Sequence, residues 1–334
     1  MNKTAIITGV TGQDGSYLAE FLLSKDYCVV GIKRRTSSNN LHRLVNVLNN
    51  PNFILVDGDV TDLISMMNIV DQYKPHEFYN LAGQSQVYVS FNQPIYTWDV
   101  DARGCLNSLE AIKQFAPKCK FYQSSSSEMF GSSFDVDNNG QKYQDEHTPM
   151  LPNSPYGIAK LSAHHTVRLY RDAYNIYACA GILYNHESSR RGEEFVTKKI
   201  AQYVGKLYKL RIQEYSFSLA KLKLGNLSAY RDWGFAGDYV EAMWLILQQT
   251  YADDYVVGTG KVYSVEDFLV EAFKYIGIDD YREYVDIDKQ LLRPVEVPYL
   301  CSKPTRIESL GWKPKVNFKQ LVQMMVDNEK VYSY

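Results

Sequence analysis

A glycine-rich segment that directly follows a short apolar run is the feature that most restricts how this chain can fold. The run at residues 5–8 is Ala-Ile-Ile-Thr, and Gly9, Gly12 and Gly15 follow it with G-x-x-G-x-x-G spacing. We expect a strand at the run and a helix that begins near Ser16. The first glycine then permits a tight turn, the second lets the backbone approach a phosphate, and the third lets the helix pack close to the strand. The helix N-terminus offers free N–H groups to an anion, so the segment predicts a pyrophosphate-binding loop.

Apolar runs and helical patterns alternate along the first half of the chain. Expected strands lie at residues 28–32, 53–56, 78–81, 120–123 and 178–183, and expected helices at residues 101–115 and 156–174. This order predicts an α/β fold, a Rossmann-type doubly wound parallel sheet whose ligands lie at the carboxyl ends of the strands.

The alternation weakens after residue 184, which predicts a division into two parts. We expect residues 1–184 to form the Rossmann domain and residues 185–334 to form a smaller C-terminal mixed α/β domain that mainly binds substrate. Some of its segments are expected to return to the Rossmann sheet. The polar stretch at residues 134–146 is expected to be a surface loop.

Composition is that of an ordinary globular enzyme. Hydrophobic residues make up 45% of the 334 residues, charged residues make up 22%, and the net charge is −2. These values predict binding neither to nucleic acid nor to a membrane surface. The longest apolar runs fall well short of the roughly eighteen residues of a membrane span, and the first apolar run is the predicted strand rather than a secretory leader.

The cysteines indicate a reducing compartment. They are scattered without C-x-x-C pairs, so we expect reduced, buried thiols, a cytoplasmic protein and no metal site. The five cysteines are Cys28, Cys105, Cys119, Cys179 and Cys301.

The end of the second expected strand indicates which dinucleotide the loop binds. An acid usually stands here and holds the ribose 2′-hydroxyl of NAD, but this chain has Lys-Arg-Arg-Thr-Ser-Ser at residues 33–38. Arg35 can bind a 2′-phosphate with its planar guanidinium, and Arg34 and Ser37 are further candidates. We therefore predict NADP; the alternative is a solvated basic loop.

A Tyr and a Lys with helical spacing supply the chemistry that such a cofactor requires. Tyr156 and Lys160 stand four residues apart, so both lie on one helical face. An ammonium near the phenol favours tyrosinate and lowers the Tyr pKa, which would let Tyr156 accept a proton from an alcohol. Alone, the pair is equally compatible with a surface Tyr and a solvated Lys. Beside a glycine loop, it predicts hydride transfer.

The glycine spacing and the Tyr156–Lys160 pair resemble the extended branch of the short-chain dehydrogenase/reductase superfamily. The resemblance implies a hydroxyl residue at the end of the fifth strand that bonds the substrate alcohol, which by spacing is Ser126. Glu128 follows two residues later, where epimerases of this superfamily usually have a small or apolar residue. Nucleotide-sugar dehydratases have an acid there that removes the C5 proton. Dehydration is therefore implied, and a helix-cap or salt-bridge role for Glu128 is the alternative.

Longer stretches resemble the GDP-mannose 4,6-dehydratase family. They include residues 81–85, 185–200, 224–234 and 293–297, and the block N-H-E-S-S-R-R-G-E-E-F-V-T at residues 185–197 is specific to that family. The resemblance implies an NADP-dependent hydro-lyase that converts GDP-mannose into GDP-4-keto-6-deoxymannose. Hydride leaves C4, water is eliminated across C5–C6, and the hydride returns to C6. A homodimer or homotetramer is also implied, with the Arg35 loop near a subunit contact.

The same resemblance implies roles for individual residues. Tyr156 would take the proton of the 4-hydroxyl, Ser126 would orient that hydroxyl, and Glu128 would remove the C5 proton and help expel the 6-hydroxyl. Lys160 would hold the nicotinamide ribose. The cofactor-binding residues expected from the loops and the resemblance are Gly9, Thr11, Gly12, Gln13, Asp14, Gly15, Arg34, Arg35, Ser37, Asp59, Val60, Leu81, Ala82, Gln84, Ser85, Tyr96, Tyr156, Lys160, His186 and Arg191. The expected substrate-binding residues are Ser85, Ser126, Asn185, Lys199, Arg231, Arg293 and Glu296.

Departures from the family pattern leave the sugar open. Ser126 replaces the usual Thr, and Ser228 and Tyr230 replace an acid and a lysine. Cys301 and Ser302 belong to a Cys-Ser-Lys-Pro segment that replaces a Gly-Asp-Pro stretch of the family. We expect these changes to lie near the sugar pocket. The alternatives are therefore another GDP-sugar such as GDP-manno-heptose, a reductase or epimerase on the same scaffold, and a non-catalytic NADP-binding protein.

Overall fold

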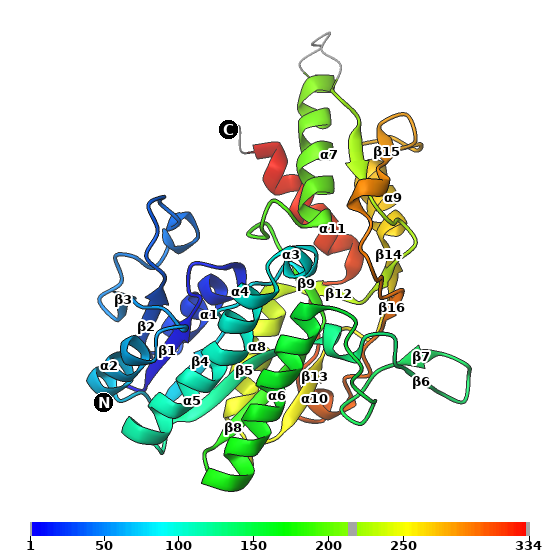
Figure 1. Ribbon diagram of the computed structural model, residues 1–334. Helices are drawn as coiled ribbons and strands as arrows, with labels where there is room; N and C mark the ends of the chain where they lie inside the picture. The colour runs from blue at the N-terminus through cyan, green and yellow to red at the C-terminus, as the bar shows by residue number, and fades with distance from the viewer. Residues whose placement is uncertain (1, 213–218, 332–334) are drawn as a thin grey trace.

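A seven-stranded parallel sheet forms the centre of the molecule, in the order β13-β8-β5-β4-β1-β2-β3 (Figure 1). The computed structural model describes residues 2–212 and 219–331. The strands of this sheet are β1 (Thr4–Thr8), β2 (Cys28–Lys33), β3 (Phe53–Asp57), β4 (Glu77–Asn80), β5 (Lys120–Ser126), β8 (Ala178–Leu183) and β13 (Asp254–Val257). All neighbouring strands pair in parallel, which confirms the predicted doubly wound sheet.

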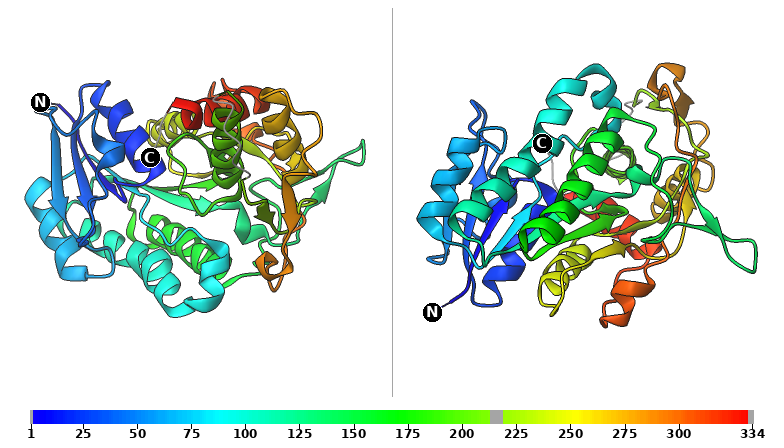
Figure 2. Two further views of the ribbon diagram at one scale, coloured as in Figure 1. Left: turned by 90° about the horizontal axis from the view of Figure 1, so that it is seen from above. Right: turned by 60° about the horizontal axis from the view of Figure 1, so that its bottom comes forward.

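Helices cover both faces of the sheet, which explains why its strands are almost continuously apolar. One face carries α1 (Gln13–Leu23) and α8 (Ala236–Leu247), whose buried Leu and Met side chains share one core. The other carries α2 (Leu63–Tyr73), α5 (Gly104–Phe115) and α6 (Pro155–Tyr174), as Figure 2 shows. All six residues of β8 are buried between these layers.

The chain leaves β1 and β4 in opposite directions, which opens a crevice at their carboxyl ends. Gly9 has a φ of +67°, and a Cβ there would lie 2.9 Å from the Ala82 backbone. A Cβ on Gly15 would lie 2.4 Å from the Gly9 carbonyl oxygen. Both positions therefore require glycine. Helix α1 begins at Gln13, three residues before the expected start near Ser16, because Gly12 already serves as its N-cap.

Other expected element ends also differ from the structure, two of them by three residues. Strand β5 continues through the serines to Ser126, because residues 124–126 pair with β8. The expected helix at residues 101–115 is preceded by a π-turn, η2 (Asp99–Arg103), and α5 itself begins at Gly104.

The expected surface loop at residues 134–146 is instead an antiparallel hairpin of β6 (Asp135–Val136) and β7 (Lys142–Tyr143). It projects from the body of the molecule in Figures 1 and 2. Its base is anchored by Gln144, which is fully buried and accepts hydrogen bonds from the Tyr184 hydroxyl and the Cys301 N–H. The polar composition of the stretch concealed this anchor.

A second core lies beyond the carboxyl ends of the sheet. Helices α7 (Val196–Ile212), α9 (Val265–Tyr275) and α11 (Phe318–Val331) pack around it. Short sheets join this part: β9 (Asn185–Glu187) with β12 (Trp233–Phe235), β10 (Leu222–Leu224) with β15 (Val285–Ile287), and β11 (Tyr230–Arg231) with β14 (Tyr263–Ser264) and β16 (Tyr299–Leu300). Since β13 belongs to the central sheet and α8 packs against that sheet, the chain passes between the two parts more than once. The predicted domain limits at residue 184 stay a prediction.

Further short elements complete the described chain. They are α3 (Val87–Asn92), α4 (Pro94–Trp98), α10 (Thr305–Ser309), η1 (His42–Leu44), η3 (Ser127–Phe130) and η4 (Lys289–Leu291). Within the described ranges, every helix is too short or too polar to cross a membrane. All five cysteines are free thiols, of which Cys28 is only half-buried.

Candidate active site

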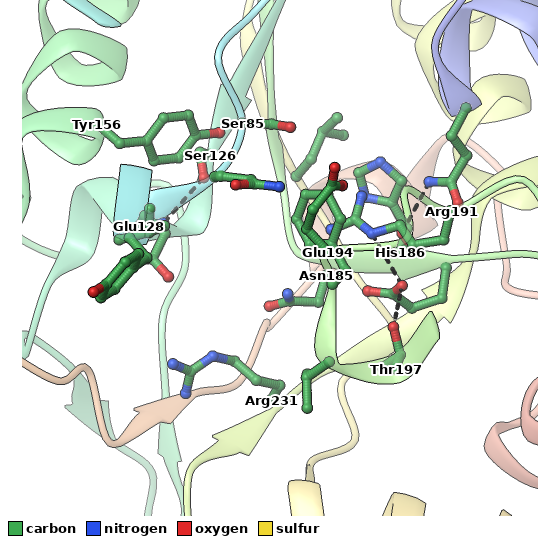
Figure 3. A pocket seen from close by; sticks show the side chains of 18 of the residues that line it. Ser85, Ser126, Glu128, Tyr156, Asn185, His186, Arg191, Glu194, Thr197 and Arg231 are labelled. Carbon is green, nitrogen blue, oxygen red and sulfur yellow. Dashed lines mark hydrogen bonds and ion pairs between the residues drawn. The ribbon is translucent and has the colours of Figure 1, made fainter. Parts of the chain in front are cut away.

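A cavity of about 730 Å³ opens at the carboxyl ends of β1, β4 and β5 (Figure 3). The glycine loop, the loop after β4, the end of β5 and the start of α6 form one side of it. The block at residues 185–199 and segments from residues 223–233 and 291–296 form the other. It is thus enclosed by both parts of the chain, at the place where a doubly wound fold binds ligands.

The glycine loop has the geometry of a dinucleotide cradle. Gly9, Gly12 and Gly15 line the cavity together with Thr11 and Gln13. Gly12 caps α1 without any side-chain hydrogen bond, so the first-turn N–H groups of the helix face the cavity without a side-chain partner. The close approaches at Gly9 and Gly15 pack the loop tightly against the segment after β4 and against the end of β1. These residues fit the predicted cofactor.

His186 joins this cradle to the second part of the chain. Its Nε2 lies 2.7 Å from Asp14 Oδ2, and its Nδ1 lies 2.7 Å from the Tyr184 carbonyl oxygen. Burial disfavours the charged ring, but the Asp14 carboxylate outweighs it and raises the pKa of His186. Because both ring nitrogens face acceptors, we assign a protonated imidazole here. It neutralises the Asp14 charge beside the predicted phosphate site.

The N-terminus of α6 places the Tyr and the Lys in the cavity. The side chain of Ser154 caps this helix by accepting from the Gly157 N–H at 3.0 Å, and Pro155 occupies the first turn. Tyr156 therefore stands in the first turn and Lys160 one turn later, and both side chains are buried. Lys160 Nζ donates to the Ser124 carbonyl oxygen at 3.0 Å.

Ser126 and Glu128 complete this group, as expected from the sequence. Ser126 ends β5, and its hydroxyl oxygen accepts from the Glu128 N–H at 3.2 Å, which caps the turn η3. Figure 3 shows Tyr156, Ser126 and Glu128 at one end of the cavity and His186 and Arg191 at the other. Glu128 is half-buried and its carboxylate lines the cavity.

The pKa of Tyr156 differs in direction from the expectation. Burial raises it above its usual value, and the Lys160 ammonium acts in the lowering direction without overcoming burial. The local i,i+4 pattern could not reveal this, because desolvation depends on the complete fold. A single nearby ammonium therefore does not by itself make tyrosinate the favoured form in the free protein.

Two arginines form a cationic side of the cavity opposite Ser126. Arg231 Nη2 lies 3.2 Å from Glu296 Oε1, and Arg293 Nη1 lies 3.7 Å from the same oxygen. Arg293 Nη1 also lies 3.4 Å from Glu128 Oε1. Burial lowers the pKa of Arg231, although Glu128 and Glu296 partly counteract it. Arg231 is buried and Arg293 is half-buried, and guanidinium groups in such positions beside open volume suit an anionic ligand.

Most of the predicted site residues line this one cavity, but some do not. Predicted residues outside its lining are Arg34, Arg35, Ser37, Asp59, Val60, Gln84 and Tyr96. Arg34, Arg35 and Ser37 follow β2, and Asp59 and Val60 follow β3. Arg34 hydrogen-bonds to the Tyr96 hydroxyl, and Asp59 accepts from the Thr61 N–H at 2.9 Å. Their assignment to the cofactor stays a prediction.

The cavity also contains residues that the sequence did not indicate. Glu187 Oε2 accepts from the Thr197 hydroxyl at 2.6 Å and lies 3.1 Å from Arg191 Nε, at an angle that makes an ion pair rather than a hydrogen bond. Below the cavity floor, Asp101 lies 3.9 Å from Lys160. Asp101 stands at the start of the expected helix at residues 101–115, where an acid is common, so the sequence carried no signal for it.

Of the departures from the family pattern, Ser126 lines the cavity, whereas Ser228, Tyr230, Cys301 and Ser302 lie outside its lining. Ser228 and Tyr230 are exposed, and Tyr230 packs against Tyr299 with ring centroids 6.1 Å apart. Cys301 and Ser302 are buried, and Ser302 hydrogen-bonds to the fully buried Asp232. These substitutions therefore change supporting structure rather than the cavity wall.

Comparison with known proteins gives a consistent result. A family model described as GDP-mannose 4,6 dehydratase matches residues 6–325. The chain is 48% identical to GDP-mannose 4,6 dehydratase 1 of Arabidopsis thaliana, over 98% of this chain and 90% of that protein. It is 44% identical to the human GDP-mannose 4,6 dehydratase, over 97% of this chain and 90% of that protein.

A solved structure of Thermus thermophilus UDP-glucose 4-epimerase in complex with NAD has the same fold. The TM-score is 0.82 at 23% identity, covering 99% of this chain and all of that chain (100%). This likeness concerns the fold, since the sequences are distant.

Proposed function

The chain belongs to the GDP-mannose 4,6-dehydratase family, a family of hydro-lyases, and we propose that it converts GDP-mannose into GDP-4-keto-6-deoxymannose with NADP as cofactor. The observation that carries this proposal is the position of Glu128 in the same cavity as Ser126, Tyr156 and Lys160. The last three suffice to oxidise an alcohol. A carboxylate beside them adds the base that dehydration needs.

The first step is removal of the proton from the sugar 4-hydroxyl. When bound, the nicotinamide cofactor accepts the hydride from C4 and returns it later to C6. Tyr156 accepts the hydroxyl proton, and Ser126 hydrogen-bonds to the same oxygen. The Lys160 ammonium, fixed by the Ser124 carbonyl, stabilises the negative charge that Tyr156 carries before it takes the proton.

The second step is loss of water across C5–C6. The 4-keto group acidifies the C5 proton, which Glu128 removes. As an acid, Glu128 then donates that proton to the departing 6-hydroxyl, so one residue serves both half-steps. In the free protein Glu128 lies 3.4 Å from Arg293. We propose that the substrate diphosphate attracts Arg293 and leaves Glu128 free to act as a base.

The cationic side of the cavity supports a diphosphate substrate. Arg231 and Arg293 share the carboxylate of Glu296, and a diphosphate can take up either guanidinium in its place. Asn185 and Lys199 line the same region. The net charge of the chain is −2, so these cations in the cavity, and not the overall charge of the protein, would attract an anionic substrate.

GDP-mannose is favoured over related sugars by the position of the family departures. Only Ser126, which keeps the hydroxyl of the usual Thr, lies in the cavity lining; Ser228, Tyr230, Cys301 and Ser302 lie outside it. Substitutions outside the cavity wall leave the sugar pocket of the family in place. GDP-manno-heptose remains the comparison substrate for the experiment below.

NADP rather than NAD is supported by the residues that follow β2. This strand ends at Lys33 without the acid that would repel a 2′-phosphate, and Lys33 is paired with Asp57. Arg35 is exposed, with a guanidinium available for the phosphate. We also propose that the enzyme works in the cytoplasm, where its free thiols stay reduced, as a homodimer or homotetramer.

Mass spectrometry of GDP-mannose incubated with the protein and a catalytic amount of NADP⁺ tests the reaction. Loss of one water without net cofactor reduction is expected. Stoichiometric NADPH consumption would favour a reductase, an unchanged mass with an inverted centre would favour an epimerase, and complete absence of turnover would contradict the proposal. The same assay with GDP-manno-heptose decides between the two sugars.

A further inference from the structure

Asp101 is a buried carboxylate that the proposed reaction does not yet use. It lies in the π-turn η2, is 1% exposed, and its Oδ2 has no hydrogen-bond partner within the described ranges 2–212 and 219–331. Its Oδ1 accepts from the Gln84 N–H at 3.0 Å. A buried carboxylate oxygen without a partner is rare in proteins and needs a physical explanation.

The π-turn directs this carboxylate toward the catalytic lysine. Asp101 Oδ1 lies 3.9 Å from Lys160 Nζ. Gly83 provides the space, because a Cβ there would lie 2.6 Å from Asp101 Oδ1. Local widening of a helix by one residue per turn often occurs at functional sites, since it redirects side chains.

The charged and titratable groups around the Asp101 carboxylate lie on several elements. Lys160 is the cation that faces Asp101, and Tyr156 stands one turn before Lys160 on α6. Cys105 on α5 stays a thiol, because burial raises its pKa to about 12. Asp14 on α1 acts on Lys160, and Glu128 on η3 acts on Tyr156, each through longer-range electrostatics. On η2 itself, Asp99 is paired with Arg103 at 3.5 Å.

We propose that Asp101 and Tyr156 share one negative charge opposite the Lys160 ammonium, so that tyrosinate forms together with a neutral Asp101 carboxyl. The two forms contain the same atoms and differ only in whether the phenol or the carboxyl carries the proton. Both keep the buried cluster neutral overall. The orphaned Oδ2 is the oxygen that gains the proton, and Asp101 acts as a positioning residue because it reaches the substrate only through Tyr156 and Lys160.

The direction of the pKa shifts agrees with this arrangement. Burial raises the pKa of Asp101 to about 7, with Lys160 and the Gln84 N–H acting in the opposite direction. Burial also raises the pKa of Tyr156, and a charged Asp101 raises it further. Two acids that interact in this way titrate as a pair, and ionisation of one suppresses ionisation of the other.

The inference rests on the proposed function, because Tyr156 must be the base that oxidises C4. The test therefore isolates that step in a Glu128→Gln background, where elimination is blocked and the absorbance of reduced cofactor reports C4 oxidation. With Asp101 present, the rate of C4 oxidation should rise with pH and then flatten above about pH 7, because Asp101 then shares the one negative charge with Tyr156. With Asp101→Asn, the rate should continue to rise about tenfold per pH unit until Tyr156 ionises.

The control is Asp99→Asn in the same turn, whose profile should flatten like that of the parent. Identical profiles for Asp101→Asn and the parent would overturn the proposal. Should Asp101→Asn fail to fold, infrared difference spectra of the wild-type protein labelled with ¹³C-aspartate still decide. A neutral carboxyl band that weakens near pH 7 while a tyrosinate band appears supports the proposal, and absence of the carboxyl band above about pH 5 contradicts it. This measurement needs no turnover, so its result is separate from that of the GDP-mannose assay.

Discussion

At the scale of single residues, Glu128 distinguishes dehydration from simple oxidation of an alcohol. Glu128→Gln keeps the shape of the side chain but removes the base, so we expect kcat for dehydration to fall by roughly 100- to 10,000-fold. Oxidation at C4 should persist, because Tyr156 and Lys160 are intact. Reduced cofactor should therefore accumulate after addition of GDP-mannose, which stopped-flow absorbance measures.

A matched control for this experiment is Glu110→Gln on α5, a carboxylate paired with Lys113 away from the cavity. Its kcat should equal that of the wild type. If Glu128→Gln retains full dehydratase activity, the base must be another group.

At the same scale, Arg35 is the residue proposed to select NADP over NAD. Loss of a hydrogen bond to a charged group weakens binding by about 1.5–3 kcal/mol, so Arg35→Ala should weaken NADP⁺ binding roughly 10- to 150-fold. Binding of NAD⁺, which has no 2′-phosphate, should change little. Isothermal titration calorimetry with both cofactors measures the difference, and an equal loss for both would show that Arg35 does not read the phosphate.

At the scale of elements, the His186–Asp14 pair holds the N-terminus of α1 against β9. The pKa of His186 is raised because the attraction of Asp14 exceeds the effect of burial. Its stabilising contribution is therefore fully present below the unfolded-state pKa of about 6.5 and is lost as the pH rises through the folded-state value. The pair is thus strongest under mildly acidic conditions.

His186→Gln should lower the free energy of unfolding by about 2 kcal/mol near pH 6, and the difference from wild type should shrink as the pH rises. Thermal unfolding of both proteins between about pH 5 and about pH 9 measures it. The control His147→Gln removes an exposed imidazole and should have little effect at any pH. A difference that grows with pH would show that the ring is neutral.

At the scale of the whole molecule, exposed apolar side chains gather on neighbouring helices of one face. Four of these side chains are between 40% and 74% exposed. They are Ile95 and Trp98 on α4, Leu106 on α5 and Leu169 on α6. Helix α6 packs against both α4 and α5, so these side chains lie on neighbouring helices. An exposed apolar face of this kind is typical of a subunit contact.

Leu169→Glu should therefore convert the proposed homodimer or homotetramer into a smaller species, because a charge cannot be buried without a partner. Size-exclusion chromatography with light scattering measures the mass. The control Leu292→Glu changes an exposed leucine of similar accessibility (43%) on the opposite part of the chain and should leave the assembly intact. An unchanged mass for Leu169→Glu would place the contact elsewhere.

Features that depend on neighbouring residues in the chain could be predicted from the sequence. The strand–glycine–helix unit and the Tyr156–Lys160 pair follow from periodicity and turn chemistry, which act over a few residues. The role of Ser126 came from the family resemblance, since periodicity ended the strand at residue 123. The doubly wound sheet follows from the repetition of such units. Helix and strand ends shifted by a few residues, because caps and sheet pairing set them.

Features that depend on distant segments were decided by the tertiary structure. Burial of Gln144, the position of Asp101 beneath Lys160, and the placement of Ser302 outside the cavity all involve contacts across many residues of chain. The net direction of the Tyr156 pKa belongs here too, because desolvation exists only once the core has closed around the phenol. The sequence by itself determined which chemical groups the cavity contains; packing determined how their charges balance.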